Sequence, residues 1–482
     1  MDLDGFSGVK WSAASQIGRQ LAQLLSATVL ARLLDPTDFG LLAMAFVVTG
    51  LVGLFKDLGT AAAVVQKKDL GDTLLSSIFW LNVLLGVGAT IMLVVGAPLA
   101  GLVYNEPGVV IVLRILAAGF AVSGAGTVHQ ALLERQLEFR SLARLELASV
   151  LVGAAGGIAA ALLGAGVWSL VLQSLLTAVM STALLWLANR WRPSRILAWS
   201  EVLGVTRFSL NLTGYNVFGY FARNADYFLI GRFLGSQQLG VYYLAYRLLL
   251  LPVGSIGAVV GRVMYPVLSK IQDDNERIAE VYLRMVALIS FLSFPLMVAL
   301  MVAAAPLAPL VLGAAWVSII PLIQIFAPVG MLQSIGTTVG SIYQAKGRTD
   351  QMFRWGVGAG LLTIVAFLIG LRGGAKGVAV AYGLVTVVLF YPSFAIPFRL
   401  IGLPFRRLMA AINTTALGAL AMLLGMTALL GLLRQRTGSI LAVAFSLAAG
   451  LMLFILVVWR GNPQLFRQAG AICGLVRRSG DA

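Results

Sequence analysis

Long apolar stretches separated by short polar linkers dominate the chain. The 482 residues are 59% hydrophobic and only 11% charged. The apolar stretches are about 20 to 25 residues long, which as helices is enough to cross a hydrocarbon core of about 30 Å. The sequence therefore predicts an all-α polytopic membrane protein with about fourteen transmembrane spans. The expected spans cover residues 11–34, 39–65, 75–102, 109–133, 142–163, 167–189, 208–234, 239–269, 278–304, 317–345, 352–371, 377–399, 406–433 and 440–459.

Two stretches that lie 200 residues apart are similar. Residues 30–45 read LARLLDPTDFGLLAMA, and residues 230–245 read IGRFLGSQQLGVYYLA. Arg32 matches Arg232 and Gly40 matches Gly240, each at the end of one apolar stretch and the start of the next. Further identities follow at an offset of 210, among them Gly126–Thr127 with Gly336–Thr337. A duplicated helical membrane protein suggests two pseudo-symmetric lobes that rock about a shared site.

The repeat and the linkers predict the domain organisation. We expect an N-terminal lobe over residues 1–189 and a C-terminal lobe over residues 208–400, with six spans each. Between them, residues 190–207 (beginning RWRPSRILAWS) predict a cytoplasmic interfacial helix. Two additional spans occupy residues 401–460, and residues 461–482 form a basic cytoplasmic tail.

Composition excludes several kinds of site. A single cysteine permits no intrachain disulfide, and a single histidine excludes a histidine-rich metal site, so we expect neither metal nor cofactor. The net charge of +16 is explained by topology rather than by nucleic acid. With the N-terminus inside, twenty Lys and Arg residues fall in inner segments and four in outer segments. This bias predicts cytoplasmic termini and contact of the basic segments with membrane lipids.

Three basic residues lie deep in the expected spans. At about 1.5 Å per residue, Arg19, Lys56 and Arg262 each lie about 12 to 14 Å from the cytoplasmic end of their spans. A charge at such a depth usually faces a cavity or a partner. One interpretation is an anion site in the inner half of a central cavity. The alternative is that Asp57 pairs with Arg19 or Lys56 and merely closes the helix bundle.

A second group of charges lies toward the outer face. Arg223 and Asp226 are i,i+3 neighbours on the seventh span, and Arg247 lies at a similar depth on the eighth. These residues predict an outer gate or an ion-coupling site, with a purely structural ion pair as the alternative.

Polar side chains follow one face of the first and seventh spans. Gln23 belongs to the first stripe, and Asn216 and Tyr220 belong to the second. Lipid-facing helices do not carry such stripes, so we expect both spans to line a water-filled cavity in which these residues bind substrate.

The segment GVKWSAASQIGRQLAQLLSATVLARLLDPTDFGLLAMA, followed by GLFKDLGTAAAVVQ, resembles the N-terminus of the Wzx-type polysaccharide flippases. The resemblance covers essentially the whole chain and is nearest to the branch that exports colanic-acid-like and teichuronic-type repeat units. It implies two six-helix lobes with two appended spans, in the superfamily that includes the multidrug antiporters and the peptidoglycan-precursor flippase. In that flippase, basic residues on spans 1, 2 and 8 hold a diphosphate, and Arg19, Lys56 and Arg262 lie on the matching spans.

The resemblance also implies an activity and partners. The substrate would be an undecaprenyl-diphosphate-linked oligosaccharide, moved from the inner to the outer leaflet of the bacterial inner membrane by alternating access. Its lipid tail would stay in the bilayer beside spans 13 and 14. The energy would come from the membrane potential or from an H⁺ or Na⁺ gradient. A polysaccharide polymerase and a chain-length regulator are candidate protein partners.

Two other classes of function remain open from the residues. A drug or cation antiporter of the same superfamily would carry carboxylates along its cavity helices, whereas the first span here carries a cation. A polyprenol-linked glycosyltransferase or polymerase would need a sizeable outer loop with acids, arginine or histidine, whereas the outer loops here are only a few residues long.

Overall fold

A computed structural model describes residues 3–56, 60–66, 70–433 and 439–472 of the chain. Within them, side-chain positions are not described for residues 3–17, 62–63, 66, 199–218, 250–263, 266, 439 and 469–472. The described residues form helices and connecting turns, with no β-strand among them. The predicted all-α class is therefore confirmed.

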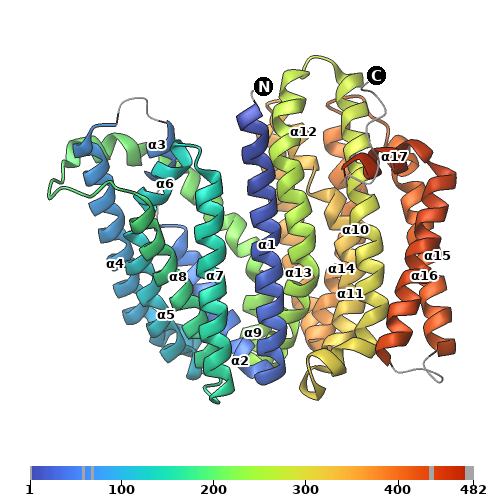
Figure 1. Cartoon of the computed structure of the whole chain (residues 1–482), viewed down its shortest axis with the longest axis horizontal. Helices are drawn as coiled ribbons and strands as arrows, with labels where there is room; N and C mark the ends of the chain where they lie inside the picture. The colour runs from blue at the N-terminus through green and yellow to red at the C-terminus, as the bar shows by residue number, and fades with distance from the viewer. Residues whose placement is uncertain (1–2, 57–59, 67–69, 434–438, 473–482) are drawn as a thin grey trace. The chain divides into compact units, whose positions relative to one another are not determined.

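The chain divides into two compact units, Met1–Tyr243 and Leu244–Ala482, which we describe separately (Figure 1). The helices that begin in the first unit are α1 (Leu3–Leu33), α2 (Pro36–Gly53), α3 (Thr60–Gln66), α4 (Asp72–Tyr104), α5 (Gly108–Gly124), α6 (Thr127–Arg135), α7 (Phe139–Leu162), α8 (Val167–Ala188) and α9 (Trp199–Lys270). The second unit contains the rest of α9 and then α10 (Asn275–Val311), α11 (Ile319–Gly336), α12 (Val339–Ala345), α13 (Thr349–Gly370), α14 (Gly374–Phe398), α15 (Phe405–Leu433), α16 (Ser439–Gly461) and α17 (Pro463–Ile472).

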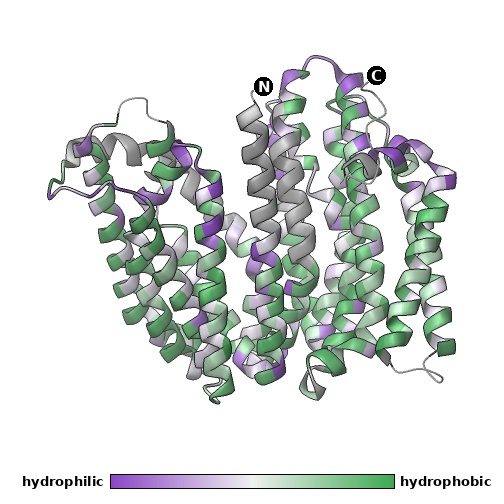
Figure 2. Ribbon diagram, viewed as in Figure 1, coloured by the Kyte–Doolittle hydropathy of each residue, from purple (hydrophilic) through white to green (hydrophobic). Residues whose placement is uncertain are grey.

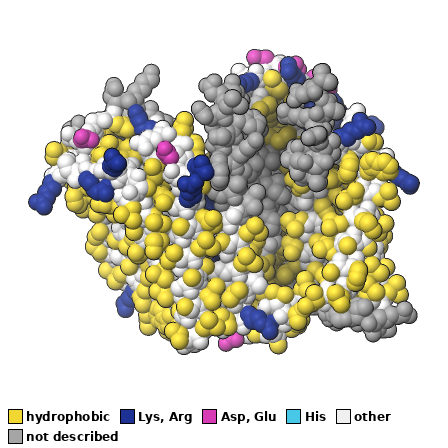
Figure 3. All heavy atoms as spheres, viewed as in Figure 1, with side chains coloured by type: hydrophobic (Ala, Val, Ile, Leu, Met, Phe, Trp, Pro, Cys, Tyr) yellow, Lys and Arg dark blue, Asp and Glu magenta, His cyan; other side chains and the backbone are white. Residues whose placement is uncertain are grey.

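The long helices are apolar on the outside as well as the inside. In the described part of the chain, nine helical stretches are long and apolar enough to cross a membrane, or ten when the bent pair α5 and α6 counts as one span. On α4, Ile91, Val95, Leu99 and Leu102 are exposed at helical spacing, although they are strongly hydrophobic. Figure 2 shows hydrophobic residues along the helices of each unit, with hydrophilic residues near their ends. On the face in Figure 3, lysine and arginine side chains likewise gather at the helix ends. The protein is therefore a multi-pass membrane protein.

Three of the predicted spans are broken by a short non-helical segment. The second span, expected to be continuous over 39–65, ends as α2 at Gly53 and resumes as α3 at Thr60. Residues 54–56 form a turn after α2, and the charged Lys56 interrupts the apolar sequence at that point. The fourth span bends by 44° between α5 and α6. The tenth is interrupted between α11 and α12, at the position that the repeat pairs with the α5–α6 break.

Packing in the first unit joins α1 to α7, α7 to α8, α8 to α5 and α5 to α4. The short helices α3 and α6 pack together at one end of the unit, around Val64, Ile78 and Val128. The Arg135 guanidinium donates a hydrogen bond to the Val64 carbonyl across 3.0 Å. Because a broken helix leaves carbonyl groups without intrahelical partners, this contact stabilises the end of α3.

The two copies of the repeat cross each other within the first unit. A Cβ built on Gly40 would lie 1.8 Å from the Ser236 carbonyl oxygen, and one built on Gly240 would lie 1.7 Å from the Pro36 carbonyl oxygen. Each glycine thus meets the residue four positions before the other glycine. Because the two contacts are equivalent, the crossing has local pseudo-two-fold symmetry. Gly235 breaks α9 at φ 82°, a left-handed conformation that glycine adopts without strain. The matching glycines thus allow contact between the backbones of the two copies.

The segment that follows α8 differs from the prediction. Residues 189–198 are not helical, and α9 begins only at Trp199. The Trp80 indole donates to the Ser194 carbonyl at 2.8 Å, and the Ala198 N–H donates to the Ser77 hydroxyl at 2.9 Å. The interfacial helix expected over 190–207 is therefore wrong for residues 190–198. Proline at 193 and these bonds to α4 favour an extended backbone.

In the second unit, α10 packs on α11, α15 and α16. Pairs of buried hydroxyl groups link α10 to its neighbours: Ser290 with Thr415 at 2.9 Å, and Ser293 with Ser334 at 2.8 Å. Tyr282 bonds to Thr338, which lies in the break between α11 and α12, at 2.8 Å. The break in the tenth span is therefore held by a hydroxyl bond from α10.

Candidate functional site

Lys56 lines a pocket in the first unit. The pocket has a volume of about 420 Å³ and is bounded by residues of α2, α5 and α8 together with Lys56. Thr49, Ser123 and Ser174 line it with hydroxyl groups that donate to carbonyls of their own helices and can still accept hydrogen bonds. Phe46, Leu116, Phe120 and Leu175 supply apolar surface. Lys56 belongs to the turn after α2 and not to the interior of a continuous span, so its predicted helical depth is wrong. A break of the helix at this point places the ammonium-bearing residue at a pocket wall instead.

Tyr220 lies against the same helix. Its hydroxyl is 2.8 Å from the Val47 carbonyl oxygen and 3.1 Å from that of Phe46, and donates to α2 there. A Cβ built on Gly50 would lie 2.3 Å from this hydroxyl, so the absence of a side chain at Gly50 admits the tyrosine. Tyr220 and Lys56 were both predicted as site residues, and the structure places both beside α2. The tyrosine hydroxyl is occupied by backbone carbonyls, which gives it a role in positioning α2.

Arg19 forms an ion pair with an acid on another helix, which the sequence did not predict. Its Nη1 lies 2.7 Å from Oε2 of Glu146 on α7, and the two side chains are 29% and 37% exposed. The basic group is therefore balanced by a carboxylate in this conformation. An anionic ligand at Arg19 would have to compete with Glu146 for the guanidinium group. Arg19 belongs to α1, whereas Lys56 belongs to the turn that follows α2.

Exchanging the charges of this pair separates its structural role from a role in binding. We expect Arg19→Glu and Glu146→Arg each to lower the melting temperature, and the double variant to restore most of it. The coupling should be about 1 kcal/mol or less, because both groups are about one-third exposed. The measurement is a double-mutant cycle of thermal unfolding in detergent, followed by transport. Restored stability with lost transport would assign Arg19 to ligand binding, whereas restored transport would make the pair structural only.

The structure describes only some of the other predicted binding residues. Gln23 lies half-buried on α1, one turn after Arg19. A hydrogen bond of 2.9 Å from the Gln173 amide to the Ser26 hydroxyl joins α8 to the same helix. Asp57 and the side chains of Asn216 and Arg262 lie outside the described residues, so their predicted roles remain predictions.

Asp226 does not form the predicted ion pair with Arg223. The acid is 3% exposed, and its Oδ2 accepts a hydrogen bond from the Tyr242 hydroxyl at 3.0 Å. Its Oδ1 accepts from the Tyr227 N–H at 2.9 Å. Arg223 is exposed and lies one turn away in the opposite direction, 3.0 Å from a Cβ built on Gly219. Arg247 belongs to the second unit, so its place in this cluster remains a prediction.

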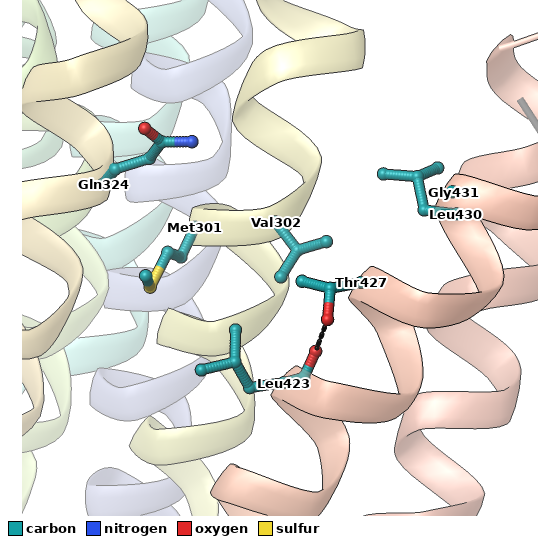
Figure 4. Close-up of a pocket in the computed structure, with 7 residues that line it drawn as sticks. All are labelled: Met301, Val302, Gln324, Leu423, Thr427, Leu430 and Gly431. Atoms are coloured by element: carbon teal, nitrogen blue, oxygen red, sulfur yellow. Dashed lines mark hydrogen bonds between the residues drawn. The ribbon is translucent and has the colours of Figure 1, made fainter.

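A second pocket lies in the second unit, among α10, α11 and α15 (Figure 4). Its volume is about 290 Å³, and it is lined by Met301, Val302, Gln324, Leu423, Thr427, Leu430 and Gly431. The Thr427 hydroxyl bonds back to the Leu423 carbonyl of its own helix at 2.8 Å, so it presents little free polarity. Gln324 supplies an amide group, and the other lining side chains are mainly apolar.

Glu146, Gln173 and the hydroxyl groups of Ser123 and Ser174 were not predicted from the sequence. Glu146 carried a usable signal, because an acid inside a predicted span requires a partner. The serines carried none, since single hydroxyl groups in spans usually bond to the preceding turn, as that of Ser174 does to the Leu170 carbonyl. No group of acids, histidine or cysteine in the described part of the chain is arranged to hold a metal ion.

The fold is that of solved membrane transport proteins. The structure matches the lipid II flippase MurJ in its inward closed conformation with a TM-score of 0.76, over 95% of this chain and 99% of that one. It also matches an inward-facing multidrug resistance MATE family transporter of the MOP superfamily, with a TM-score of 0.65 over 81% of this chain and 98% of that one. The identities are 15% and 16%, so these comparisons show the fold alone.

Sequence comparisons then show the family. Residues 29–321 match the family model described as "Polysaccharide biosynthesis protein", and the chain belongs to this family. It is 32% identical to the lipopolysaccharide biosynthesis protein WzxC of Escherichia coli (strain K12) over 79% of this chain and 78% of that protein. It is 28% identical to the teichuronic acid biosynthesis protein TuaB of Bacillus subtilis (strain 168), over 80% of each chain. The resemblance inferred from the N-terminal residues is thereby confirmed.

Proposed function

We propose that the protein is a flippase for undecaprenyl-diphosphate-linked oligosaccharides in the bacterial inner membrane. It would move repeat units to the outer leaflet for the biosynthesis of an exopolysaccharide, capsule or O-antigen. The match to a lipid II flippase over nearly the whole chain is the observation that carries the proposal. The names of the relatives, which act in lipopolysaccharide and teichuronic acid biosynthesis, support the same class of substrate.

The chemistry of the pockets is consistent with a substrate of three parts. A diphosphate needs a cation, and Lys56 brings one to a pocket that also has three hydroxyl-bearing residues. A glycan needs hydroxyl and amide groups, which the pocket and the polar face of α1 provide. A polyprenyl chain needs apolar surface, and the exposed hydrophobic face of α4 provides it within the same unit. The pair of Arg19 and Glu146 would add a second cation when the anion arrives.

Alternating access would complete the cycle. The cytoplasmic placement of both termini rests on the excess of basic residues in the inner segments. A polysaccharide polymerase would take the substrate at the outer face, and a chain-length regulator would act with it. A membrane potential or an ion gradient would supply the energy.

A multidrug antiporter is the second candidate, because of the MATE transporter's fold. The match to the MATE transporter covers 98% of that transporter but only 81% of this chain. The match to the lipid II flippase covers 95% of this chain. This chain therefore has additional helical length that the MATE transporter lacks. We favour the flippase on that ground.

Deleting the gene tests the proposal in cells. We expect cells without the protein to accumulate lipid-linked repeat units on the cytoplasmic side and to lose the surface polymer. The measurement is extraction and mass analysis of lipid-linked intermediates, with a plasmid copy of the gene as the control. Normal polymer, together with drug sensitivity that the plasmid corrects, would instead favour the antiporter.

A further inference from the structure

His129, the single histidine of the chain, lies in an aromatic box. It belongs to α6, and its side chain is 0% exposed. The ring stacks on Trp186 of α8, with centroids 4.6 Å apart and planes inclined by 24°. Trp191 and Phe79 meet the ring edge-on, with centroids 5.4 and 6.2 Å from that of the histidine. The box therefore joins α4, α6 and α8 to the segment that follows α8.

Residues 189–198, which we call the strap, supply Trp191 to this box and are bonded to α4. The Ser194 N–H and the Ser194 hydroxyl both donate to the Ser76 hydroxyl at 2.9 Å. These bonds add to the two between the strap and α4 described above. Because α9 begins at Trp199, directly after the strap, the strap fixes where α9 starts relative to α4.

The box leaves buried polar atoms without hydrogen bonds. In the described part of the chain, three buried side-chain nitrogen atoms lack a partner, namely Nδ1 and Nε2 of His129 and Nδ2 of Asn189 in the strap. A buried donor without a partner is unfavourable, and a second proton on the imidazole would add a positive charge to it. The closed box therefore accommodates neutral His129 and is destabilised by the charged form.

Arg192 of the strap holds the positions that a charged His129 would need. Its Cζ lies 5.5 Å from the centre of the Trp186 ring, on which His129 also stacks. Its Nη1 donates to the Trp191 carbonyl at 2.7 Å, and this carbonyl is also an acceptor beside the imidazole. A protonated His129 would compete with Arg192 for one ring and one carbonyl, and the two cations would repel each other.

Arg192 is the charged group that acts on the imidazole. The neighbouring helices α3 and α8 contain no ionisable side chain. On α6, Glu134 accepts from the Gln130 amide, and Arg135 donates to a carbonyl of α3. The other charged side chains at the adjoining ends of α4, α7 and the strap are exposed: Asp72, Glu138, Arg140, Arg144, Arg190 and Arg195. Water and salt screen these exposed charges, so the balance lies between His129 and Arg192.

We infer that the strap is a pH-dependent latch, which is closed on α4 when His129 is neutral and released when His129 binds a proton. The step is the reversible addition of H⁺ to the free imidazole nitrogen, and no other covalent bond forms or breaks. On the topology that the basic residues predict, this end of the unit faces the cytoplasm, so the latch responds to cytoplasmic pH. Release frees the start of α9 from α4 and slows transport. The effect on transport rests on the proposed function, whereas the latch itself does not.

Hydrogen exchange measures the latch without any substrate. In the purified full-length protein, the amides of Ser194 and Ala198 are bonded to α4 and should be protected at about pH 7.5. They should lose this protection by about pH 5.5, after correction for the pH dependence of exchange itself. His129→Phe keeps an aromatic ring in the box but cannot bind a proton, so its strap should stay protected at both pH values.

Two arginine variants separate the switch from a merely structural contact. Arg192→Gln removes the competing cation, so the strap should be released at a higher pH than in the wild type. Arg195→Gln is the matched control, because Arg195 is exposed on the same strap, and it should keep the wild-type pH of release. Equal loss of protection in the wild type and His129→Phe, lasting protection in the wild type, or an unchanged release pH in Arg192→Gln overturns the inference.

Transport gives the second arm of the test. In liposomes with the same pH on both sides, flipping by the wild type should slow between about pH 7.5 and about pH 5.5, and His129→Phe should lose this dependence. The same slowing in both proteins contradicts control of transport by the latch. Absence of flipping by the wild type at the higher pH counts against the proposed function, while hydrogen exchange still decides the latch.

Discussion

Replacing Gly240 or Gly40 with alanine is expected to prevent accumulation of folded protein. A Cβ at these positions would lie 1.7 and 1.8 Å from carbonyl oxygens of the partner copy of the repeat. Neither oxygen belongs to a flexible side chain, so the backbones would have to separate. We expect a destabilisation of more than about 3 kcal/mol, above the usual cost of overpacking a core.

The measurement is the yield of monodisperse protein and its melting temperature in detergent. Gly88→Ala is the matched control, because Gly88 also lies on a helix but its Cβ would meet nothing within 4 Å. This control should be neutral or slightly stabilising, since alanine favours a helix over glycine by about 0.5–1 kcal/mol. Wild-type stability of Gly240→Ala would show that the two copies do not touch at this point.

Replacing Lys56 with alanine is expected to reduce transport by about 10- to 100-fold while leaving the protein folded. Lys56 lies in the turn after α2, at the wall of a pocket, so its removal creates no gap in a packed core. A hydrogen bond to a charged group contributes about 1.5–3 kcal/mol, and each 1.4 kcal/mol changes an equilibrium constant tenfold. Lys56→Arg should retain much of the activity, because it keeps the positive charge.

Polymer export in a deletion strain, normalised to protein in the membrane, measures this effect. Lys376→Ala is the matched control: this lysine is exposed at the start of α14 and lines neither pocket. It should export polymer at the wild-type rate. Equal export by Lys56→Ala and the wild type would remove Lys56 from the binding site.

The sequence predicted the class of fold because hydrophobic length is a strong signal. The apolar stretches, which are long enough to span a membrane, predicted an all-α membrane protein. The similarity between residues 30–45 and 230–245 predicted that it arose by duplication. The repeat also identified the two glycines that meet at the crossing, although only the structure shows that they touch. Backbone contact between distant segments depends on tertiary packing, which periodicity does not report.

The site was predicted in part. The sequence singled out Lys56 and Tyr220, because charged and polar side chains in apolar stretches are rare and conspicuous, and their roles in binding remain predictions. The end of α2 at Gly53 was missed, since hydropathy averaged over a window conceals a short interruption. Pairing was the weakest prediction. Arg19 is paired with Glu146, 127 residues away in sequence, and Asp226 is bonded to Tyr242 and not to Arg223. Sequence spacing reports neighbours on one helix and cannot report partners on another.

Flipping by the purified protein is the most direct test of the central claim. The full-length chain would be placed in liposomes with a fluorescent undecaprenyl-diphosphate oligosaccharide, and a membrane-impermeant quencher would report the fraction in the outer leaflet. We predict that the wild type moves this lipid between leaflets, that Lys56→Ala is about 10- to 100-fold slower, and that a phospholipid with no diphosphate is not moved. Failure of the wild type to accelerate flipping, or equal movement of both lipids, would contradict the account.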